Sequence, residues 1–145
     1  MSLCLFAVTA PGRPWRGMLY AMDGRMHPCT PHLWKAWDYF GIQDAVLHGY
    51  WEADCPVQMG REDILASVYV KPGKALVALA SWCQEDARVK LVIDWEKLGM
   101  RPEKAILEAA EIKSSSRPIG CKNLIQIDFL ENMQEFQSHL QFLVE

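Results

Sequence analysis

The sequence lacks the features that would place it in several large classes of protein. No stretch of its 145 residues approaches the roughly 20 consecutive apolar residues that a membrane-spanning helix needs. The apolar run at residues 3–8 is short and has no basic flank, which is too little for a signal peptide. Acidic and basic residues are mixed along the chain, the formal net charge is −3, and no basic stripe is present. We therefore expect no membrane and no nucleic acid among its partners.

Cysteines that could pair or bind zinc are also missing. The chain has five cysteines, an odd number, and no two of them stand at the CxxC spacing of a zinc ribbon. They are Cys4, Cys29, Cys55, Cys83 and Cys121. This pattern favours a reducing compartment and, with no signal peptide, a cytoplasmic location. Cys83 has no evident base near it in sequence, so we expect a buried, inert thiol.

What the sequence does contain is the composition of a folded domain. Half of the residues are hydrophobic and 23% are charged, which argues against disorder. A chain of this length corresponds to one domain, or to one domain with a remnant of another. It should bury roughly two-thirds of its unfolded surface, so a core is expected without disulfides or metals.

One helix is predicted near the N-terminal end. Thr30 and Pro31 offer an N-cap followed by proline at the first helical position, and Gly41 stands where a C′ glycine belongs. Leu33, Trp34, Trp37 and Phe40 fall on one face of the helix predicted over residues 31–40. Upstream, the apolar run at 17–22 predicts a single short strand.

Three apolar runs in the middle of the chain predict strands. The runs at 64–70 and 75–82 are joined by Pro72-Gly73, and a third run at 88–94 alternates between apolar and charged residues. The near-continuous apolarity of the first two runs indicates strands that are covered on both faces. Since Pro-Gly favours a type II turn, we expect a bulge or a longer loop between them. We interpret the three runs as an antiparallel meander.

The remainder of the chain is less regular. Asp94 can cap a short turn at 95–98 that Gly99 closes, and 124–130 is typical of a strand. The composition of 102–112 favours a helix, whereas its length and position would equally fit another strand of the sheet. The tail from residue 131 has apolar residues at the spacing of an amphipathic helix. The predicted fold is mainly β, an antiparallel β-sandwich-like domain with one N-terminal helix and a possible C-terminal helix.

Several short motifs stand in an order that is typical of a known family. They are Trp15-Arg16-Gly17-Met18-Leu19-Tyr20, the segment 33–42 (LWKAWDYFGI), His48-Gly49-Tyr50-Trp51, Asp54-Cys55-Pro56-Val57, Leu65-Ala66-Ser67-Val68-Tyr69, the segment 73–82 (GKALVALASW), Ile93-Asp94-Trp95 and Leu98-Gly99. In this order they resemble the C-terminal region of bacterial glycoside-hydrolase-like proteins related to glycoside hydrolase family 123. The resemblance covers roughly residues 15–112.

The resemblance implies a full-length relative in which a (β/α)8 barrel precedes an antiparallel β-domain. Residues 1–44 would then be a barrel-adjacent strand and helix remnant, and 45–145 the antiparallel β-domain. The family's domain would make 104–112 a strand, and we favour the strand. A barrel would also cover the apolar stripe of the helix, so without it we expect self-association through 1–44 or mobility of that region.

Family 123 chemistry resembles substrate-assisted cleavage of an N-acetylhexosaminide by an adjacent Asp-Glu pair at the end of a barrel strand. The chain contains no Asp-Glu dipeptide, because Glu62-Asp63 and Glu85-Asp86 are reversed. A barrel also needs roughly 200 residues or more. We therefore assign no catalytic residue and no cofactor, and we expect this chain alone to be inactive.

Two polar clusters are candidate sites. His27, Cys29 and His32 could bind a metal, but a zinc site wants a further ligand that the sequence does not show, so a polar loop before a helix is favoured. Glu52 and Asp54 could form a carboxylate pair, but in a loop before Pro56 solvated side chains are favoured.

The six tryptophans offer another kind of site, since aromatic faces can stack on sugar rings. Trp34, Trp37 and Trp82 lie in regular apolar runs and are expected in the core. The carbohydrate-contact candidates are Trp15, Arg16, Tyr50, Trp51 and Glu52. Packing between a barrel and a β-domain is the alternative role for these residues.

Two functions follow. The first is an accessory C-terminal β-domain of a glycoside-hydrolase-like protein, structural or sugar-site-shaping, whose partners would be carbohydrate or a (β/α)8 barrel domain. The alternative is a free-standing carbohydrate-binding or protein-interaction β-module.

Overall fold

The computed structural model describes residues 2–8, 31–82, 85, 87–109, 123–129 and 140–144. Its helices are α2 (Pro31–Phe40) and the short 3-10 helices η2 (Ile42–Asp44) and η3 (Pro102–Lys104). Its strands are β1 (Ser2–Val8), β2 (Val46–His48), β3 (Val57–Met59), β4 (Ile64–Lys71), β5 (Lys74–Ser81), β6 (Ala87–Ile93), β7 (Ile106–Ala109), β8 (Asn123–Phe129) and β9 (Leu140–Val144). The predicted strand at 17–22 lies outside the described residues.

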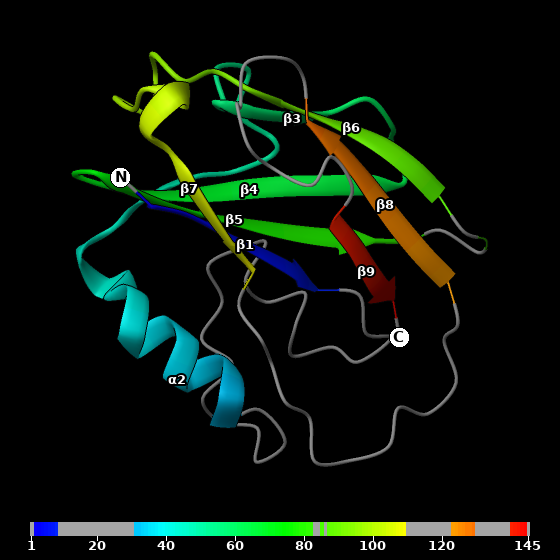
Figure 1. Cartoon of the computed structure of the whole chain (residues 1–145), viewed down its shortest axis with the longest axis horizontal. Coiled ribbons are helices and arrows are strands. Elements are labelled where there is room, and N and C mark those ends of the chain that lie inside the picture. Colours follow the sequence, from blue (N-terminus) through cyan, green and yellow to red (C-terminus); the bar gives the residue numbers. More distant parts are fainter. Residues whose placement is uncertain are drawn as a thin grey trace.

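The strands form two sheets (Figure 1). One has five strands in the order β2-β4-β5-β1-β7, and the other has four in the order β3-β6-β8-β9. The helix α2 lies outside both sheets, at the lower left of the view. The predicted fold class, a mainly β sandwich with an N-terminal helix, is confirmed in the described part of the chain.

The two sheets contain both antiparallel and parallel pairs of strands. Neighbours such as β4 and β5, or β8 and β9, run antiparallel, as do β2 with β4 and β3 with β6. In contrast, β1 runs parallel to both β5 and β7, and β6 runs parallel to β8. Parallel neighbours need long crossover connections, which explains why these pairings leave no local signal in the sequence.

The β4–β5 hairpin is tighter than predicted. The two strands pair without interruption up to Lys71 opposite Lys74, so the expected bulge or longer loop is wrong. Pro72 and Gly73 alone make the turn, and Gly73 has a φ of 73°. Proline followed by a residue with positive φ is the pattern of a type II turn, which this hairpin therefore tolerates.

The predicted meander is also wrong in its last step. β6 does alternate, with Ala87, Val89 and Leu91 buried and the residues between them exposed. However, β6 pairs with β3 and β8 in the second sheet, because β1 occupies the edge of β5 that a meander would leave for β6. An alternating pattern shows that one face of a strand is buried, and it does not identify the neighbouring strand.

The core lies between the two sheets. Side chains of β4 and β5 meet those of β3 and β6 there, with Leu98 and Met100 from the following turn. The buried residues from the four strands are Val57, Ile64, Ala66, Val68, Ala75, Val77, Leu79, Ala87, Val89 and Leu91. The opposite face of the β4–β5 hairpin is buried too, as predicted for strands covered on both faces.

The predicted helix is confirmed, and a lysine of β4 binds carbonyl groups at its C-terminal end. Gly41 takes the left-handed conformation, with a φ of 73°, and its N–H bonds to the carbonyl of Trp37. The Lys71 ammonium group at the end of β4 donates to the carbonyls of Phe40 and Gly41, at 3.1 Å each. Trp37 and Phe40 are buried, whereas Tyr39 is 80% exposed. Leu33 and Trp34 belong to α2, but their side-chain positions lie outside the described part.

The turn after β6 forms as predicted. The Asp94 carboxylate accepts the N–H of Lys97, which caps the turn. At its end, the N–H groups of Gly99 and Met100 bond to the carbonyls of Glu96 and Trp95, the pattern of a Schellman motif. Pro102 then opens η3, and β7 confirms the strand that was favoured within 104–112.

The predicted C-terminal helix is wrong over residues 140–144, which form β9 and pair with β8. Apolar residues alternate there as well, at Leu140, Phe142 and Val144, and pairing with a neighbouring strand overrides the helical spacing. Residues 131–139 lie outside the described residues. The division into 1–44 and 45–145 stays a prediction.

Candidate functional site

Residues 49–56 connect β2 with β3 and carry the candidate residues Tyr50, Trp51 and Glu52. We call this segment the site loop. Two turns shape it, closed by hydrogen bonds from Glu52 N–H to the Gly49 carbonyl and from Cys55 N–H to the Glu52 carbonyl. The loop is fastened to the hairpin because the N–H of Tyr50 donates to the Ser67 hydroxyl at 3.1 Å. Ser67 is fully buried in β4.

Trp51 is held in the loop with much of its indole in solvent. Its side chain is 54% exposed, and its ring lies over Gly49 so closely that a Cβ atom at position 49 would overlap it. Tyr50 meets the same indole edge to face, with ring centroids 5.2 Å apart and an interplanar angle of 83°. A side chain at position 49 would displace the indole, and the contacts with Gly49 and Tyr50 hold the indole in one position.

Glu52 is oriented by two neighbours. Its carboxylate accepts the N–H of Gly49 at 3.0 Å and lies 3.3 Å from Nδ1 of His48. The side chain is about one-third exposed, so one side of the carboxylate still reaches solvent. A carboxylate with several lone pairs and two protein partners keeps capacity to accept further hydrogen bonds from a ligand.

Cys55 lies at the inner end of the site loop. The thiol is buried and free, and it donates to the carbonyl of His48 at 3.7 Å. Burial raises the pKa of this thiol, and the nearby carboxylates of Glu52 and Asp54 act in the same direction. The arrangement favours an uncharged thiol over a nucleophilic thiolate.

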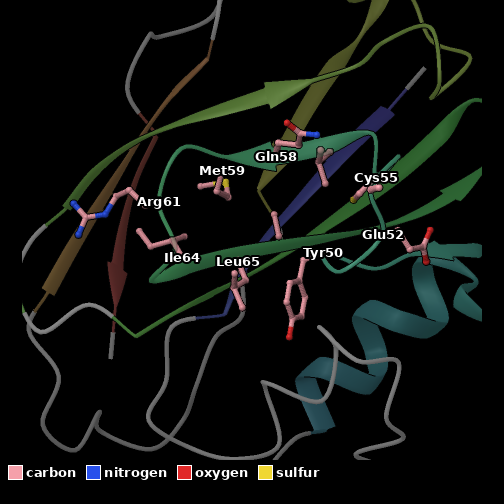
Figure 2. Close-up of a pocket in the computed structure, with 11 residues that line it drawn as sticks. Tyr50, Glu52, Cys55, Gln58, Met59, Arg61, Ile64 and Leu65 are labelled. Carbon is pink, nitrogen blue, oxygen red and sulfur yellow. The ribbon is translucent and has the colours of Figure 1, made fainter.

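A pocket of about 270 Å³ opens beside the site loop. Three segments line it: the site loop, β3 with the residues after it, and the beginning of β4. The lining residues are Tyr50, Glu52, Ala53, Cys55, Val57, Gln58, Met59, Arg61, Ile64, Leu65 and Ala66. Figure 2 shows Glu52 and Arg61 at opposite ends of this pocket, with Tyr50 close to Leu65.

The charges around the pocket are unequal. The guanidinium of Arg61 is engaged by Asp63, with Nε and Nη2 at 2.8 and 2.7 Å from the two carboxylate oxygens. Such a bidentate pair leaves little positive charge for a ligand. Glu52 is the one acidic residue among those that line the pocket. The pocket is therefore weakly acidic at one end and close to neutral at the other.

The carbohydrate-contact candidates divide into two groups. Tyr50, Trp51 and Glu52 come together in the site loop, whereas Trp15 and Arg16 lie outside the described residues. Of the expected core tryptophans, Trp37 is buried and Trp82 is only half-buried. The carboxylate-pair candidate does not form one group at the pocket, because Asp54 is exposed and does not line it.

Sequence reasoning missed the residues that complete the pocket, among them Gln58, Met59 and Arg61. Nothing local identifies them, because β3 faces β4 only through the packing of the two sheets. Ser67 had a signal in the sequence, since it is the one serine inside the apolar run at 64–70 and a buried hydroxyl needs a partner.

Of the metal candidates, His27 and Cys29 lie outside the described residues, and of His32 only the backbone is described. Cys83, which was expected to be a buried thiol, also lies outside them. Across the described residues, no three side chains of histidine, cysteine, aspartate or glutamate come together as a metal site. No helix within those residues is long and apolar enough to cross a membrane.

The chain matches the model of a known protein family. The family model described as "Glycoside hydrolase 123, C-terminal domain" matches residues 29–140. Neither a curated protein nor a solved structure matches the chain at a significant level. The family match covers α2 and the strands from β2 to the beginning of β9, leaves out β1, and extends past residue 112, where the resemblance in short motifs ended.

Proposed function

Because the chain belongs to the family of glycoside hydrolase 123 C-terminal domains, we propose that it is an accessory β-domain of a glycoside-hydrolase-like protein that helps to shape a sugar site. One observation supports a contact with sugar. The exposed indole of Trp51 is seated on Gly49 and against Tyr50, beside the pocket that Tyr50 and Glu52 line. The same contact would serve the alternative, a free-standing carbohydrate-binding module.

The chemistry of these groups suits carbohydrate. An indole offers a flat apolar face to the C–H faces of a pyranose ring, and seating it in advance reduces the entropy lost on binding. The Glu52 carboxylate next to it accepts hydrogen bonds from sugar hydroxyls. An aromatic face with an oriented carboxylate beside it is a common arrangement for a ring that has apolar faces and polar edges.

The proposed role is binding without hydrolysis. Most glycosidases use two carboxyl groups across the scissile bond, one as acid and one as base or nucleophile. Glu52 alone among the pocket-lining residues carries a carboxylate, and it already accepts from Gly49 and His48. Catalytic carboxylates are assigned to a barrel domain outside this sequence.

The sugar contact is tested by titrating the chain with neutral oligosaccharides while recording the indole N–H signals by NMR. We expect the Trp51 signal to shift saturably and the Trp51→Ala variant to bind at least tenfold more weakly. Tyr39→Ala is the matched control, because Tyr39 is a more exposed aromatic residue on α2. Gly49→Ala should also weaken binding, since its methyl group would displace the indole. Equal binding by Trp51→Ala and the unaltered chain would refute the contact.

The absence of catalysis is tested with aryl N-acetylgalactosaminides and other aryl glycosides. We expect no release of the aryl group above the uncatalysed rate. A turnover number on the order of 1 per second, typical of enzymes, would contradict the accessory role if it survived repurification.

A protein-interaction role is the second candidate. Tyr39 and Val46 are 80% and 62% exposed, and they stand on either side of the turn that leads from α2 to β2. These side chains would suit contact with a barrel domain or a second copy of the chain. Light scattering tests self-association: a dimer that Tyr39→Ala or Val46→Asp converts to a monomer would support it, and a monomer at all concentrations would exclude it.

A further inference from the structure

One wall of the pocket is the backbone of β4 at Ala66. On the side away from β5, no described strand pairs with this part of β4. β4 and β5 pair around a two-residue turn, so Lys71 and Lys74 must exchange both of their backbone hydrogen bonds. Counting back from that pair, every second residue of β4 bonds to β5. The residues between, including Ala66, therefore direct their N–H and C=O groups toward the opposite edge of the strand.

That edge is covered over only part of its length. β2 pairs with Val68–Val70 and ends there. Within the described strands nothing pairs with Ala66 on this side, although Ala66 is only 3% exposed and lines the pocket. Buried backbone groups are nearly always hydrogen-bonded, to protein, water or a ligand. The N–H and C=O of Ala66 thus give the pocket a donor and an acceptor with fixed positions.

We propose that this pocket binds one pyranose ring of a neutral carbohydrate. The ring's hydroxyl groups bond to the N–H and C=O of Ala66 and to the Glu52 carboxylate, while Trp51 stacks on the adjoining ring at the mouth. The proposal rests on the proposed sugar contact at Trp51, and adds a second subsite and a class of sugar to it.

The size and lining of the pocket fit a single ring. Its volume of about 270 Å³ lies below the roughly 300–1,000 Å³ of pockets for drug-sized ligands. Val57 and Ile64 give it an apolar floor, and both are almost fully buried. Polar groups stand around this floor, with Glu52 at one end and Gln58 on β3 (Figure 2). An apolar floor with polar edges matches a ring whose faces are C–H and whose rim is hydroxyl.

The charges select against acidic sugars. The pocket offers no unengaged cation, because Arg61 is paired with Asp63 in a bidentate contact. Glu52 adds a negative charge at the other end, and like charges brought together in a partly desolvated site are unfavourable. Uronic acids should therefore bind more weakly than neutral pyranosides.

An extended peptide fits the same edge less well. Strand addition needs a run of outward-facing backbone groups, and here the edge is open only from the beginning of β4 to Ala66. The site loop closes the edge beyond that point, where Tyr50 N–H bonds to the Ser67 hydroxyl. An added strand would have to displace this loop, whereas a single ring would not.

The test is an NMR titration of the whole 145-residue chain at pH 7.5 with methyl glycosides of glucose, galactose and mannose, and with glucuronic acid. We expect the amide signals of Ala66 and Glu52 to shift saturably with at least one neutral glycoside, with a Kd on the order of 1 mM. Glucuronic acid should bind at least tenfold more weakly. Ala53→Phe, which places a large side chain in the pocket from an exposed loop position, should abolish the Ala66 shift.

The controls separate this proposal from the one on which it rests. Gln43→Phe places the same side chain at an exposed, uncharged position that does not line the pocket, and should leave binding unchanged. Shifts at Trp51 with none at Ala66 would refute the pocket subsite but would support the sugar contact at Trp51. No shift at either residue with any sugar would overturn both. An Ala66 response to an extended peptide but to no sugar, or equal binding of glucuronic acid, would also refute the proposal.

Discussion

The β4–β5 hairpin and the site loop are in contact with each other, and they differ in burial and in regular structure. In β5, Ala75–Ala80 are all buried, and the hairpin contributes a large share of the core. The site loop has an exposed aromatic residue, an oriented carboxylate and two turns in place of regular structure. The two regions meet where Tyr50 bonds to Ser67. The hairpin therefore supplies stability and the loop carries the proposed sugar contact, so mutations should affect one property more than the other.

The largest effect is expected in the hairpin. Leu76 is fully buried, and Leu76→Ala should lower the free energy of unfolding by about 2–5 kcal/mol, because it removes apolar contacts and leaves a cavity. Urea unfolding measures this. Val92→Ala is the control, since Val92 is 42% exposed on the neighbouring sheet and its truncation should cost within about 0.5 kcal/mol. Equal losses for the two variants would contradict the assignment of stability to the hairpin.

A smaller effect should appear at the junction and reach both regions. Ser67→Ala removes the acceptor of the Tyr50 N–H, and losing a hydrogen-bond partner in a buried setting costs about 1–2 kcal/mol. Sugar binding should weaken too, because the loop loses its attachment to β4. Hydrogen exchange measures the change: the Tyr50 amide should exchange faster, while the Ala105 amide, bonded to Pro102 in η3, should not. An unchanged Tyr50 rate would show that this bond does not hold the loop.

Gly73 in the hairpin turn and Gly60 after β3 form a matched pair for substitution. Gly73→Ala should cost about 1 kcal/mol, because a residue with a Cβ is strained at a φ of 73° even where space is open. Gly60 also has open space around its Cα but no positive φ, so Gly60→Ala should be neutral within about 0.5 kcal/mol. Thermal unfolding of the two variants decides this, and a larger loss for Gly60→Ala would argue against the turn geometry.

The smallest effect concerns the Cys55 thiol in the site loop. Its pKa is raised above the ordinary value of 9.0, so the unfolded chain loses this proton at a lower pH than the folded chain does. The stabilisation is thus fully present below pH 9 and is lost as the pH rises through the folded-state pKa. Urea unfolding between pH 8 and 10 should show a steeper alkaline loss for the unaltered chain than for Cys55→Ala. Parallel curves for the two proteins would contradict the shift.

The same comparison explains what could be predicted from the sequence. The helix at 31–40, the two strands of the hairpin and the alternation of β6 follow from local patterns of apolar residues, caps and turns, and all are confirmed. The neighbours of those strands do not follow, because β1 comes from the other end of the chain and pairs in parallel. The predicted meander was wrong for this reason. The predicted C-terminal helix was wrong because β9 pairs with β8, the strand before it, and this pairing overrides the helical spacing.

The candidate site, too, could be predicted from the sequence only in part. Tyr50, Trp51 and Glu52 were recognisable as an aromatic and polar cluster outside regular runs, and the structure brings them together. The backbone edge at Ala66 was not recognisable, because it depends on how far β2 extends along β4. Pockets between two sheets depend on packing of distant segments, and such packing leaves no pattern in neighbouring residues.

Calorimetric titration of a neutral oligosaccharide into the unaltered chain, Trp51→Ala and Leu76→Ala, with a thermal melt of each protein, tests the separation of sugar binding from stability most directly. We expect Trp51→Ala to keep the melting temperature of the unaltered chain and to lose at least tenfold in affinity. We expect Leu76→Ala to melt well below the unaltered chain and, at a temperature where it remains folded, to retain the affinity. Undiminished binding by Trp51→Ala, or no binding by the unaltered chain, would contradict the account.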